Sequence, residues 1–379
     1  MPEPLKLAEL KLRMQAYGIR PKKKFGQNIL CDFNLLKAIV ADAEIDEGDC
    51  VLEIGTGAGS LTGYLCDAAG LVVSVEVDPG MFELSRDVLA GVGNLVQVHV
   101  DALNQQGRGL NDELVASLAE YMRTGELPLL DVGTRGSVSS DSTSSPGDTR
   151  QRVPTVHSHL SGNPPRCGRL KLVANLPYSV ATAVLIAALE SGLPFERMLV
   201  MVQYDVAEKL AAEPGTQHWG LPSLLRWCFA DAMIKRRVPA KVFWPKPKVE
   251  SALLELTPHP NRFENGDSPR WGQSPAYHKL RRLAHVLFQH RRKAASNSLA
   301  LALHEPNART SAWIQACGGD PGLRPEQLTP EVLLQLAQHA EVEPLVRKAM
   351  QLHEDQLAEK AAKLARRAEW KQRVYGEEE

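Results

Sequence analysis

Four consecutive residues, Asn175-Leu176-Pro177-Tyr178, carry groups that can activate an aromatic amine. The exocyclic amine of adenine is a weak nucleophile because its lone pair is delocalised into the ring, so a catalyst must orient it. The Asn175 side-chain oxygen and a main-chain carbonyl beside the rigid Pro177 can each accept one N–H hydrogen bond. Tyr178 offers a ring on which a base can stack. The tetrapeptide predicts a site that aims an amine at an electrophilic carbon; the alternative is an incidental proline turn.

A glycine-rich turn, EIGTGAG over residues 53–59, lies between an apolar run and a helical pattern. Glycines allow a ligand to approach the backbone, and the N-terminus of the following helix favours polar or anionic groups. The dinucleotide fingerprint requires a third glycine where this chain has Ser60, which argues against a bound pyrophosphate. A sulfonium nucleoside such as S-adenosylmethionine has no pyrophosphate and is compatible with this turn.

Two acidic residues end the next two apolar runs. Glu76 is placed to accept hydrogen bonds from both hydroxyls of a ribose, and Asp101 is placed to accept one from an adenine amine. The alternatives are that Gly55 and Gly57 only shape a turn and that both acids lie on the surface. Ligands bind at the carboxyl ends of strands in doubly wound sheets, so the three features together predict a nucleoside site.

Strand and helix patterns alternate around these residues. Apolar, β-branched runs at residues 50–54, 71–78, 95–103, 170–178, 197–205 and 249–258 indicate strands, and residues 33–43 have helical spacing. Strands that alternate with helices predict an α/β fold with a doubly wound, Rossmann-like sheet. After about Pro260 the strand signals stop, and helical periodicity over residues 276–303 and 325–352 predicts a small C-terminal helical domain.

The alternation is interrupted between Leu103 and Leu170. A short helical pattern at residues 111–122 leads into a stretch rich in Ser, Gly, Pro, Thr and Asp, at about residues 131–168. Such a stretch cannot offset its own ordering entropy, so we expect a disordered surface insertion. A longer flexible loop costs little, and deletion of residues 132–165 should therefore leave folding intact.

The composition, 44% hydrophobic and 23% charged residues in 379, is typical of a globular protein. No apolar stretch approaches the roughly 20 residues of a membrane span, and the N-terminus lacks the pattern of a secretory signal. We therefore expect a cytoplasmic monomer with no membrane partner. The six cysteines contain no CxxC pair, so we expect reduced thiols and no bound metal.

Basic residues are clustered although the net charge is only -1. Affinity for nucleic acid depends on local positive surface, so the total charge decides little. The chain has basic groups at residues 22–24, 235–237 and 279–293. Any one of them is compatible with a solvated face, but three together predict contact with an RNA backbone. The expected RNA-binding residues are Lys22, Lys23, Lys24, Arg291, Arg292 and Lys293.

The motifs together resemble the small-subunit ribosomal RNA adenine dimethyltransferases, the KsgA family. The resemblance rests on FGQNIL (25–30), EIGTG, SVEVD, the aspartate of VDAL, NLPY, FWPKPKVESALL (243–254) and QHRRKAASNSL (289–299), which occur in the family's order. It extends from about Lys22 to about Gln338 without the insertion. It implies a class I methyltransferase that dimethylates the N6 amine of adenines in a small-subunit rRNA hairpin, with S-adenosylmethionine as cofactor and the immature small ribosomal subunit as partner in ribosome biogenesis.

The resemblance also implies roles for individual residues. Cofactor contacts are implied for Asn28, Leu30, Gly55, Glu76, Asp101 and Asn175. The implied catalytic residues are Asn175, Pro177, Tyr178 and Phe243, where Phe243 would hold the flipped adenine opposite Tyr178. The alternative for Phe243 is an ordinary core aromatic.

The domains expected from these patterns follow one another along the chain. Residues 1–21 are an N-terminal extension, and residues 22–260 form the methyltransferase domain with its insertion. Residues 261–340 form a helical RNA-binding domain. Residues 341–379 form a charged helical tail, whose simplest interpretation is a solvated helix.

Three features depart from the family pattern. The cofactor loop has Thr56 between its two glycines in place of the usual proline, which should be harmless because the glycines carry the geometry. Tyr204 follows Gln203 where the family has a basic residue, which weakens any RNA contact there. The insertion after Asp101 lies near the mouth of the site and could alter access.

Three other functions remain as alternatives. A large-subunit rRNA adenine methyltransferase is less compatible, because NLPY replaces the more typical NIPY or NIPF and the RRKxxxNSL element is present. A protein glutamine methyltransferase would have NPPY, so Leu176 argues against it. A non-catalytic ribosome assembly factor would not need the intact Asn175 and Tyr178, although an assembly role can coexist with catalysis.

Overall fold

The computed structural model describes residues 6–19, 28–107, 109–128, 155–160, 162–259 and 274–375. The chain forms two compact units. Residues 1–211 and 226–272 make up one, here called the sheet unit, and residues 212–225 and 273–379 make up the other, the helical unit. Compared with the expected domains, residues 212–225 group with the helices and the N-terminal extension groups with the sheet.

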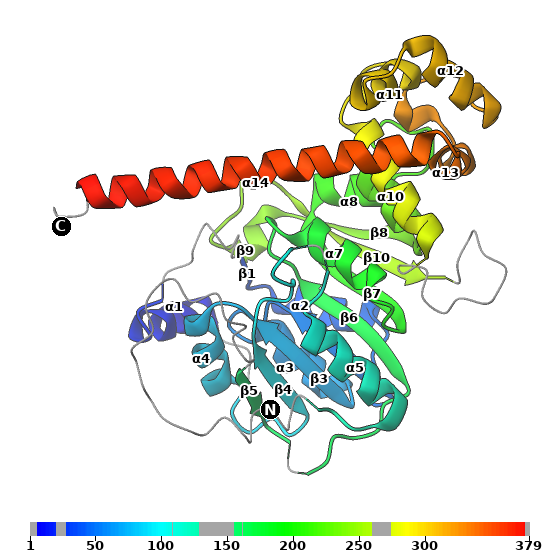
Figure 1. The fold of residues 1–379 in the computed structure, drawn as a ribbon. Helices are drawn as coiled ribbons and strands as arrows, with labels where there is room; N and C mark the ends of the chain where they lie inside the picture. Colours follow the sequence, from blue (N-terminus) through cyan, green and yellow to red (C-terminus); the bar gives the residue numbers. More distant parts are fainter. Residues whose placement is uncertain are drawn as a thin grey trace. The chain divides into compact units, whose positions relative to one another are not determined.

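An eight-stranded mixed sheet forms the centre of the sheet unit (Figure 1), with strand order β5-β4-β3-β2-β6-β7-β10-β8. The parallel strands are β2 (Asp49–Ile54), β3 (Leu71–Glu76), β4 (Leu95–His99), β6 (Arg169–Asn175) and β7 (Phe195–Gln203). The antiparallel strands are β5 (Thr155–Ser158), β8 (Ala230–Val238) and β10 (Ser251–Pro258). The order reverses at β2, which pairs with both β3 and β6, so the expected doubly wound sheet is confirmed.

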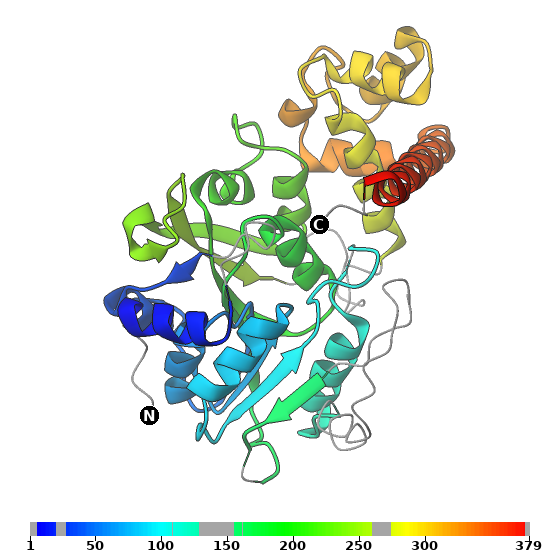
Figure 2. The same cartoon turned by 90° about the vertical axis from the view of Figure 1, so that its left-hand side faces the viewer.

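Helices cover both faces of this sheet, as the two views in Figures 1 and 2 show. The helices of the sheet unit after α1 are α2 (Phe33–Asp42), α3 (Ser60–Ala68), α4 (Pro79–Val88), α5 (Asp112–Thr124), α7 (Ala181–Glu190) and α8 (Tyr204–Ala211). Helix α4 begins where Asp78 accepts hydrogen bonds from the N–H groups of Gly80 and Met81, with Pro79 in the first turn. Helix α3 begins directly after Gly59, so its N-terminus faces the end of β2.

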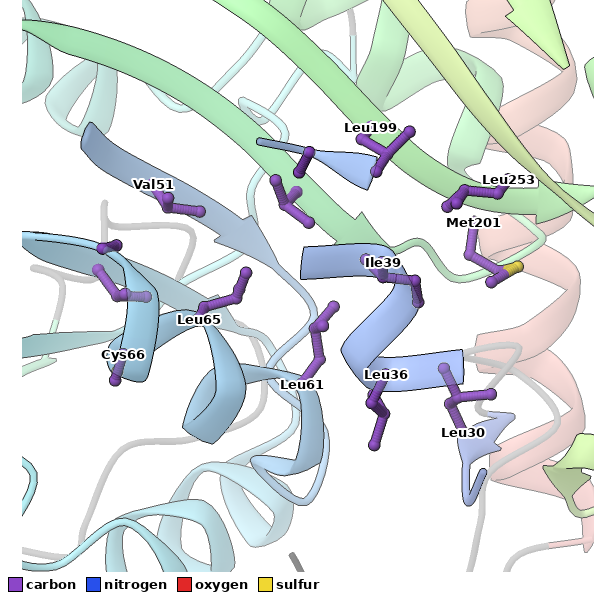
Figure 3. Packing of buried hydrophobic residues seen from close by; sticks show 14 of the residues in the cluster. Leu30, Leu36, Ile39, Val51, Leu61, Leu65, Cys66, Leu199, Met201 and Leu253 are labelled. Atoms are coloured by element: carbon purple, nitrogen blue, oxygen red, sulfur yellow. The ribbon is translucent and has the colours of Figure 1, made fainter. Parts of the chain in front are cut away.

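The core beneath the sheet is a contiguous apolar cluster (Figure 3). Val51 on β2, Leu199 and Met201 on β7, and Leu253 on β10 contribute one layer. The facing layer comes from α2 and α3, with Leu36, Ile39, Leu61 and Leu65. Burial of each such side chain stabilises the fold by about 1.5–3 kcal/mol. This packing holds in place the ends of the strands that carry the candidate site residues.

The expected disorder over residues 131–168 was wrong for part of that range; residues 129–154 and 161 lie outside the described residues. Strand β5 pairs antiparallel with β4, with Val156 opposite Val98. The Tyr121 hydroxyl on α5 donates to the carbonyl of Pro165 and accepts from the N–H of Cys167. The open edge of β4 and the Tyr121 hydroxyl therefore provide hydrogen-bond partners for this segment, which its polar composition does not reveal.

We predict that a Gly/Ser sequence of equal length in place of residues 155–160 lowers the melting temperature by about 2–4 °C, because the pairing with β4 is lost. Thermal unfolding followed by circular dichroism measures this. The affinity for S-adenosylmethionine should change much less than the stability, since no residue of β5 lines the cavity described below. Deletion of residues 132–165, which includes β5, is therefore no longer expected to be neutral. An unchanged melting temperature would show that β5 contributes nothing to stability.

The N-terminal helix α1 (Leu7–Ala16) packs on the sheet unit. Leu10 and Met14 are buried with Ile29, Ala58 and Met81. The two-residue strands β1 (Ile29–Leu30) and β9 (Phe243–Trp244) pair beside it, and the Lys11 ammonium lies 5.1 Å from the centre of the Trp244 ring. The expected extension thus contributes to the hydrophobic packing behind the glycine loop.

The helical unit is built from α10 (Pro275–Phe288), α11 (Ala295–Leu303), α12 (Asn307–Ala316), α13 (Pro330–Gln338) and α14 (Val342–Tyr375). Helix α10 buries an apolar stripe that includes Leu280 and Leu287 and packs on α13 and α14. Val342 and Val346 at the start of α14 are also buried. Helix α9 (Leu221–Trp227) spans the division between the units, and the short helices η2 (Ala240–Val242) and η4 (Pro325–Gln327) complete the described elements.

All six cysteines are free thiols, as the sequence predicts. Within the described part of the chain, no helix combines the length and the apolar character that a membrane crossing requires.

Candidate active site

A cavity of about 270 Å³ opens at the carboxyl ends of β2, β3 and β6, where the strand order reverses. The structure brings together around it eight of the residues predicted from the sequence, namely Asn28, Leu30, Gly55, Glu76, Asp101, Asn175, Pro177 and Tyr178. These residues come from five separate stretches of the chain. The doubly wound topology places them together because parallel strands end at the same edge of the sheet.

The glycine loop lies against the NLPY segment. Gly55 and Gly57 have positive φ angles of 88° and 56°, a conformation that glycine adopts without strain. A Cβ atom at Gly55 would lie 3.6 Å from Pro177 Cδ and 3.7 Å from the Asn175 carbonyl oxygen. The absence of a side chain at position 55 keeps open the narrow space between the glycine loop and the NLPY segment.

Glu76 is buried beneath the glycine loop, and its carboxylate accepts three backbone hydrogen bonds. The donors are the N–H groups of Gly57 at 2.8 Å, Val77 at 2.9 Å and Asp78 at 2.9 Å. Burial raises the pKa of the Glu76 carboxyl, and the three hydrogen bonds oppose that rise. A carboxylate has about four acceptor positions. Glu76 therefore shapes the loop and keeps acceptor capacity for a ligand hydroxyl in the cavity.

The Asn175 side chain is fixed by a residue far away in the sequence. Its Nδ2 donates to the main-chain carbonyl of Asn28 at 2.9 Å, across 147 positions of the chain. The amide nitrogen is thereby used, and the other end of the amide, Oδ1, is an acceptor at the cavity that Asn175 lines. This orientation leaves a hydrogen-bond acceptor, rather than a donor, as the unused end of the amide.

Tyr178 lines the same cavity and is held at its hydroxyl, which lies 2.6 Å from Ser251 Oγ on β10. Burial raises the pKa of the Tyr178 hydroxyl, and the hydrogen bond to Ser251 opposes this rise. The contact fixes the ring at its far end and leaves its face for stacking.

Asp101 and Leu30 complete the predicted cofactor set. Asp101 is exposed after the end of β4, and its Oδ1 accepts a hydrogen bond from the N–H of Leu103 at 3.0 Å. Leu30 is buried on β1 and contributes apolar wall. The cavity thus combines acidic groups at two strand ends with apolar surface, as a nucleoside requires.

Phe243 is not brought to this cavity. It is not among the lining residues, its side chain is 4% exposed, and it belongs to the apolar core, paired with Leu30 across β1 and β9. The expectation that it faces Tyr178 across a base is not met in this structure. Phe243 is buried because β9 pairs with β1, and the sequence motif does not reveal this pairing.

The predicted RNA-binding residues do not line the cavity. Lys22, Lys23 and Lys24 lie outside the described residues. Arg291, Arg292 and Lys293 are exposed in the turn between α10 and α11 of the helical unit, where Arg291 Nη2 donates to the Gln217 carbonyl at 3.2 Å. The basic group at residues 235–237 lies on β8. Each of its members forms an ion pair within the sheet unit: Lys235 with Glu255, Arg236 with Asp42 and Arg237 with Glu250.

Glu53 is a site residue that sequence reasoning missed. It lines the cavity behind the glycine loop, and Oε2 accepts hydrogen bonds from Thr62 Oγ1 at 2.6 Å and Ser74 Oγ at 2.9 Å. Burial raises the pKa of Glu53 to about 8. A single acid within an apolar strand, CVLEI, is the signal that could have identified it.

We predict that Glu53→Gln makes stability less dependent on pH. The folded pKa of about 8 exceeds the ordinary value of 4.5, so between these pH values the folded state keeps a proton that the unfolded state releases. Stability of the parent protein should therefore fall as pH rises from about 5 to 8 and level off above. Glutamine keeps the acceptor and removes the titration. Melting temperatures from pH 5 to 9 test this, and parallel curves for parent and variant would contradict it.

A comparison with known protein families shows to which family the chain with this site belongs. The family described as ribosomal RNA adenine dimethylase matches residues 18–312. The chain belongs to this family. The resemblance inferred from the motifs is confirmed, and this rRNA adenine dimethylase is a methyltransferase with a methyl donor of the S-adenosylmethionine type and ribosomal RNA as its substrate class.

Individual relatives agree with this assignment of the dimethylase. It is 32% identical to the ribosomal RNA small subunit methyltransferase A of Pediococcus pentosaceus, over 88% of this chain and 95% of that one. The protein of the same name from Magnetococcus marinus is 33% identical over 86% and 95% of the two chains. A solved dimethyladenosine transferase from Plasmodium falciparum matches with a TM-score of 0.52 and 18% identity, covering 81% of this chain and 95% of that chain, which shows a shared fold.

Proposed function

We propose that the protein transfers two methyl groups from S-adenosylmethionine to the N6 amine of adenines in a small-subunit rRNA hairpin during ribosome biogenesis. The observation that carries this proposal is the Asn175 amide, whose nitrogen is held by the Asn28 carbonyl at the edge of the cavity. The names of the relatives from Pediococcus pentosaceus and Magnetococcus marinus support the small-subunit substrate over the large-subunit alternative.

The donor set of the cavity fits S-adenosylmethionine. Glu76 keeps acceptor capacity for one ribose hydroxyl, rather than the two expected from the sequence, because three backbone N–H groups already donate to it. Asp101 lies at the next strand end for an adenine amine. Val77 and Val100 supply apolar surface for an adenine ring. When bound, this cofactor supplies a methyl carbon made electrophilic by the adjacent sulfonium.

Two acceptors of the chain would hold the target amine. Asn175 Oδ1 takes one N–H, and we assign the second to the Leu176 carbonyl. Of the two carbonyls flanking the Pro177 ring, that of Pro177 already accepts from the N–H of Val180 at 3.1 Å. With both N–H groups held, the nitrogen lone pair projects away from the two acceptors towards the cavity. A singly methylated amine keeps one N–H, which one of these acceptors can still hold for the second transfer.

Tyr178 would provide the stacking face for the base, since Ser251 holds its hydroxyl. No strong general base is required, because the cation formed when the amine nitrogen takes the methyl group is acidic and can lose its proton to solvent. The exposed Arg291, Arg292 and Lys293, with Lys22, Lys23 and Lys24, would contact RNA phosphates, which position a substrate without specifying its sequence.

One experiment tests this proposal directly. The protein is incubated with labelled S-adenosylmethionine and immature small subunits, and N6,N6-dimethyladenosine is then mapped. We expect dimethylated adenines in small-subunit rRNA. Methylation of naked large-subunit RNA alone would favour the alternative substrate, and binding to small subunits without methyl transfer would indicate an assembly factor.

A further inference from the structure

We propose that Tyr204 and Arg237 form a second stacking platform, at the same edge of the sheet as the target-base site, that binds a nucleotide flanking the target adenine. This inference rests on the proposed function and adds a recognition site to it. The family pattern has a basic residue where this chain has Tyr204, so the sequence alone indicated a weakened RNA contact. In the structure, Arg237 supplies a positively charged group beside Tyr204.

The Arg237 guanidinium lies over the Tyr204 ring, 4.4 Å from its centre. Tyr204 directly follows β7, and its N–H donates to the main-chain carbonyl of Glu250 at 3.0 Å. Arg237 extends from β8, and its Nε lies 2.5 Å from Glu250 Oε2. One residue of the segment before β10 thus holds both the tyrosine backbone and the arginine head group.

The platform lies at the same edge of the sheet as the target-base site, because Tyr204 follows the carboxyl end of β7 and Asn175 ends the neighbouring parallel strand β6. Ser251 on β10 is opposite Gln203 on β7, and Ala252 is opposite Arg237 on β8. Ser251 is also the residue that holds the Tyr178 hydroxyl at 2.6 Å. Ser251 itself pairs with Val238, the residue after Arg237, and successive residues of a strand point to opposite faces. The Arg237 side chain and the Tyr204 ring on which it stacks therefore project from the face of the sheet opposite to Ser251, at the same edge.

Exposure and charge indicate a nucleotide as the occupant. The Arg237 side chain is 64% exposed and Tyr204 is half-buried beneath it, so the outer face of the guanidinium is the accessible part of the stacked pair. Lys246 and Lys248, just before Glu250, are exposed and form no ion pair with any residue that the structure describes. Flat aromatic and guanidinium groups bind unstacked bases, and lysines bind phosphates. Since ribosomal RNA is the substrate class of this family, an RNA nucleotide matches both parts of this surface.

Tyr204→Ala tests the platform with immature small subunits as substrate. Loss of a stacking face should raise the KM for RNA about tenfold. The kcat at saturating RNA and the KM for S-adenosylmethionine should stay within about twofold, because neither Tyr204 nor Arg237 lines the cavity. Tyr204→Phe should behave like the parent protein, since it keeps the ring. Arg236→Gln is the matched control, because Arg236 neighbours Arg237 on β8 but pairs with Asp42.

Arg237→Gln provides an independent test if Tyr204→Ala does not fold, because Arg237 is at the surface. It should raise the KM for RNA and reduce the salt dependence of binding. An RNA KM within twofold of the parent for a folded Tyr204→Ala, or for Arg237→Gln, overturns the platform. Failure of the parent protein itself to methylate small subunits would instead overturn the proposed function, so the two failures are distinguishable.

Discussion

Asn175→Ala is expected to lower the rate of methyl transfer about 100- to 1000-fold, the range seen when one preorganised hydrogen-bonding group is removed from an active site. Alanine removes the Oδ1 acceptor that orients the amine and leaves the glycine loop and Glu76 in place. The affinity for S-adenosylmethionine should therefore change far less than the rate of methyl transfer. Single-turnover measurements with labelled S-adenosylmethionine and saturating RNA separate the two quantities.

Ser179→Ala is the matched control for this prediction. Ser179 also lines the cavity, and its hydroxyl makes no hydrogen bond with the residues that the structure describes. It should retain a rate close to that of the parent protein. Unchanged methyl transfer by Asn175→Ala would exclude the mechanism assigned to the amide, whereas equal losses in both variants would indicate a general disturbance of the cavity.

Glu76→Ala should reduce the affinity for S-adenosylmethionine at least about 100-fold and also lower the melting temperature. The substitution removes the acceptor of three backbone N–H groups, and each donor left unsatisfied costs about 1–3 kcal/mol. The same carboxylate is the proposed acceptor for a ribose hydroxyl, so ligand contact and loop shape are lost together. Calorimetric titration with the donor and thermal unfolding measure the two effects.

Glu76→Gln separates these two contributions. Glutamine keeps one acceptor oxygen for part of the backbone set, so we expect an intermediate loss of donor affinity and a smaller loss of stability. Glu83→Ala on the neighbouring helix α4 is the control, since Glu83 is exposed and pairs only with Arg86 in the described structure. Donor affinity retained by Glu76→Ala would remove Glu76 from the ribose site.

The convergence of the site could be predicted from the sequence because it follows from topology. Glu76 and Asn175 each end a strand, the glycine loop around Gly55 follows another, and parallel strands of one sheet end at one edge. Residue types therefore sufficed to place the glycine loop, Glu76 and the NLPY segment around one cavity. The confirmed doubly wound sheet has the same origin, since alternating strand and helix patterns permit few other arrangements.

Other features depended on contacts between distant residues. The hydrogen bond from Asn175 to Asn28 joins the end of β6 to the residue before β1, two segments that share no local pattern. Strand β8 contains a run of charged residues that indicates a surface cluster, but Arg236 and Arg237 pair with acids on other elements. Phe243 is buried through its pairing with β1, and β5 is ordered by the open edge of β4. In each case a partner elsewhere in the chain decides the outcome.

In the proposed mechanism, the hydrogen bond between Asn28 and Asn175 makes the backbone ahead of β1 a part of the catalyst. A carboxamide is nearly symmetric in shape, and within the described part of the chain this carbonyl determines which of its two ends is left as an acceptor. If position 28 were displaced, the amide could turn over and present hydrogen atoms to an amine that itself offers hydrogen atoms. The pocket would still fill with both reactants, but the reaction would stall, so a lesion in this segment would mimic loss of the asparagine itself.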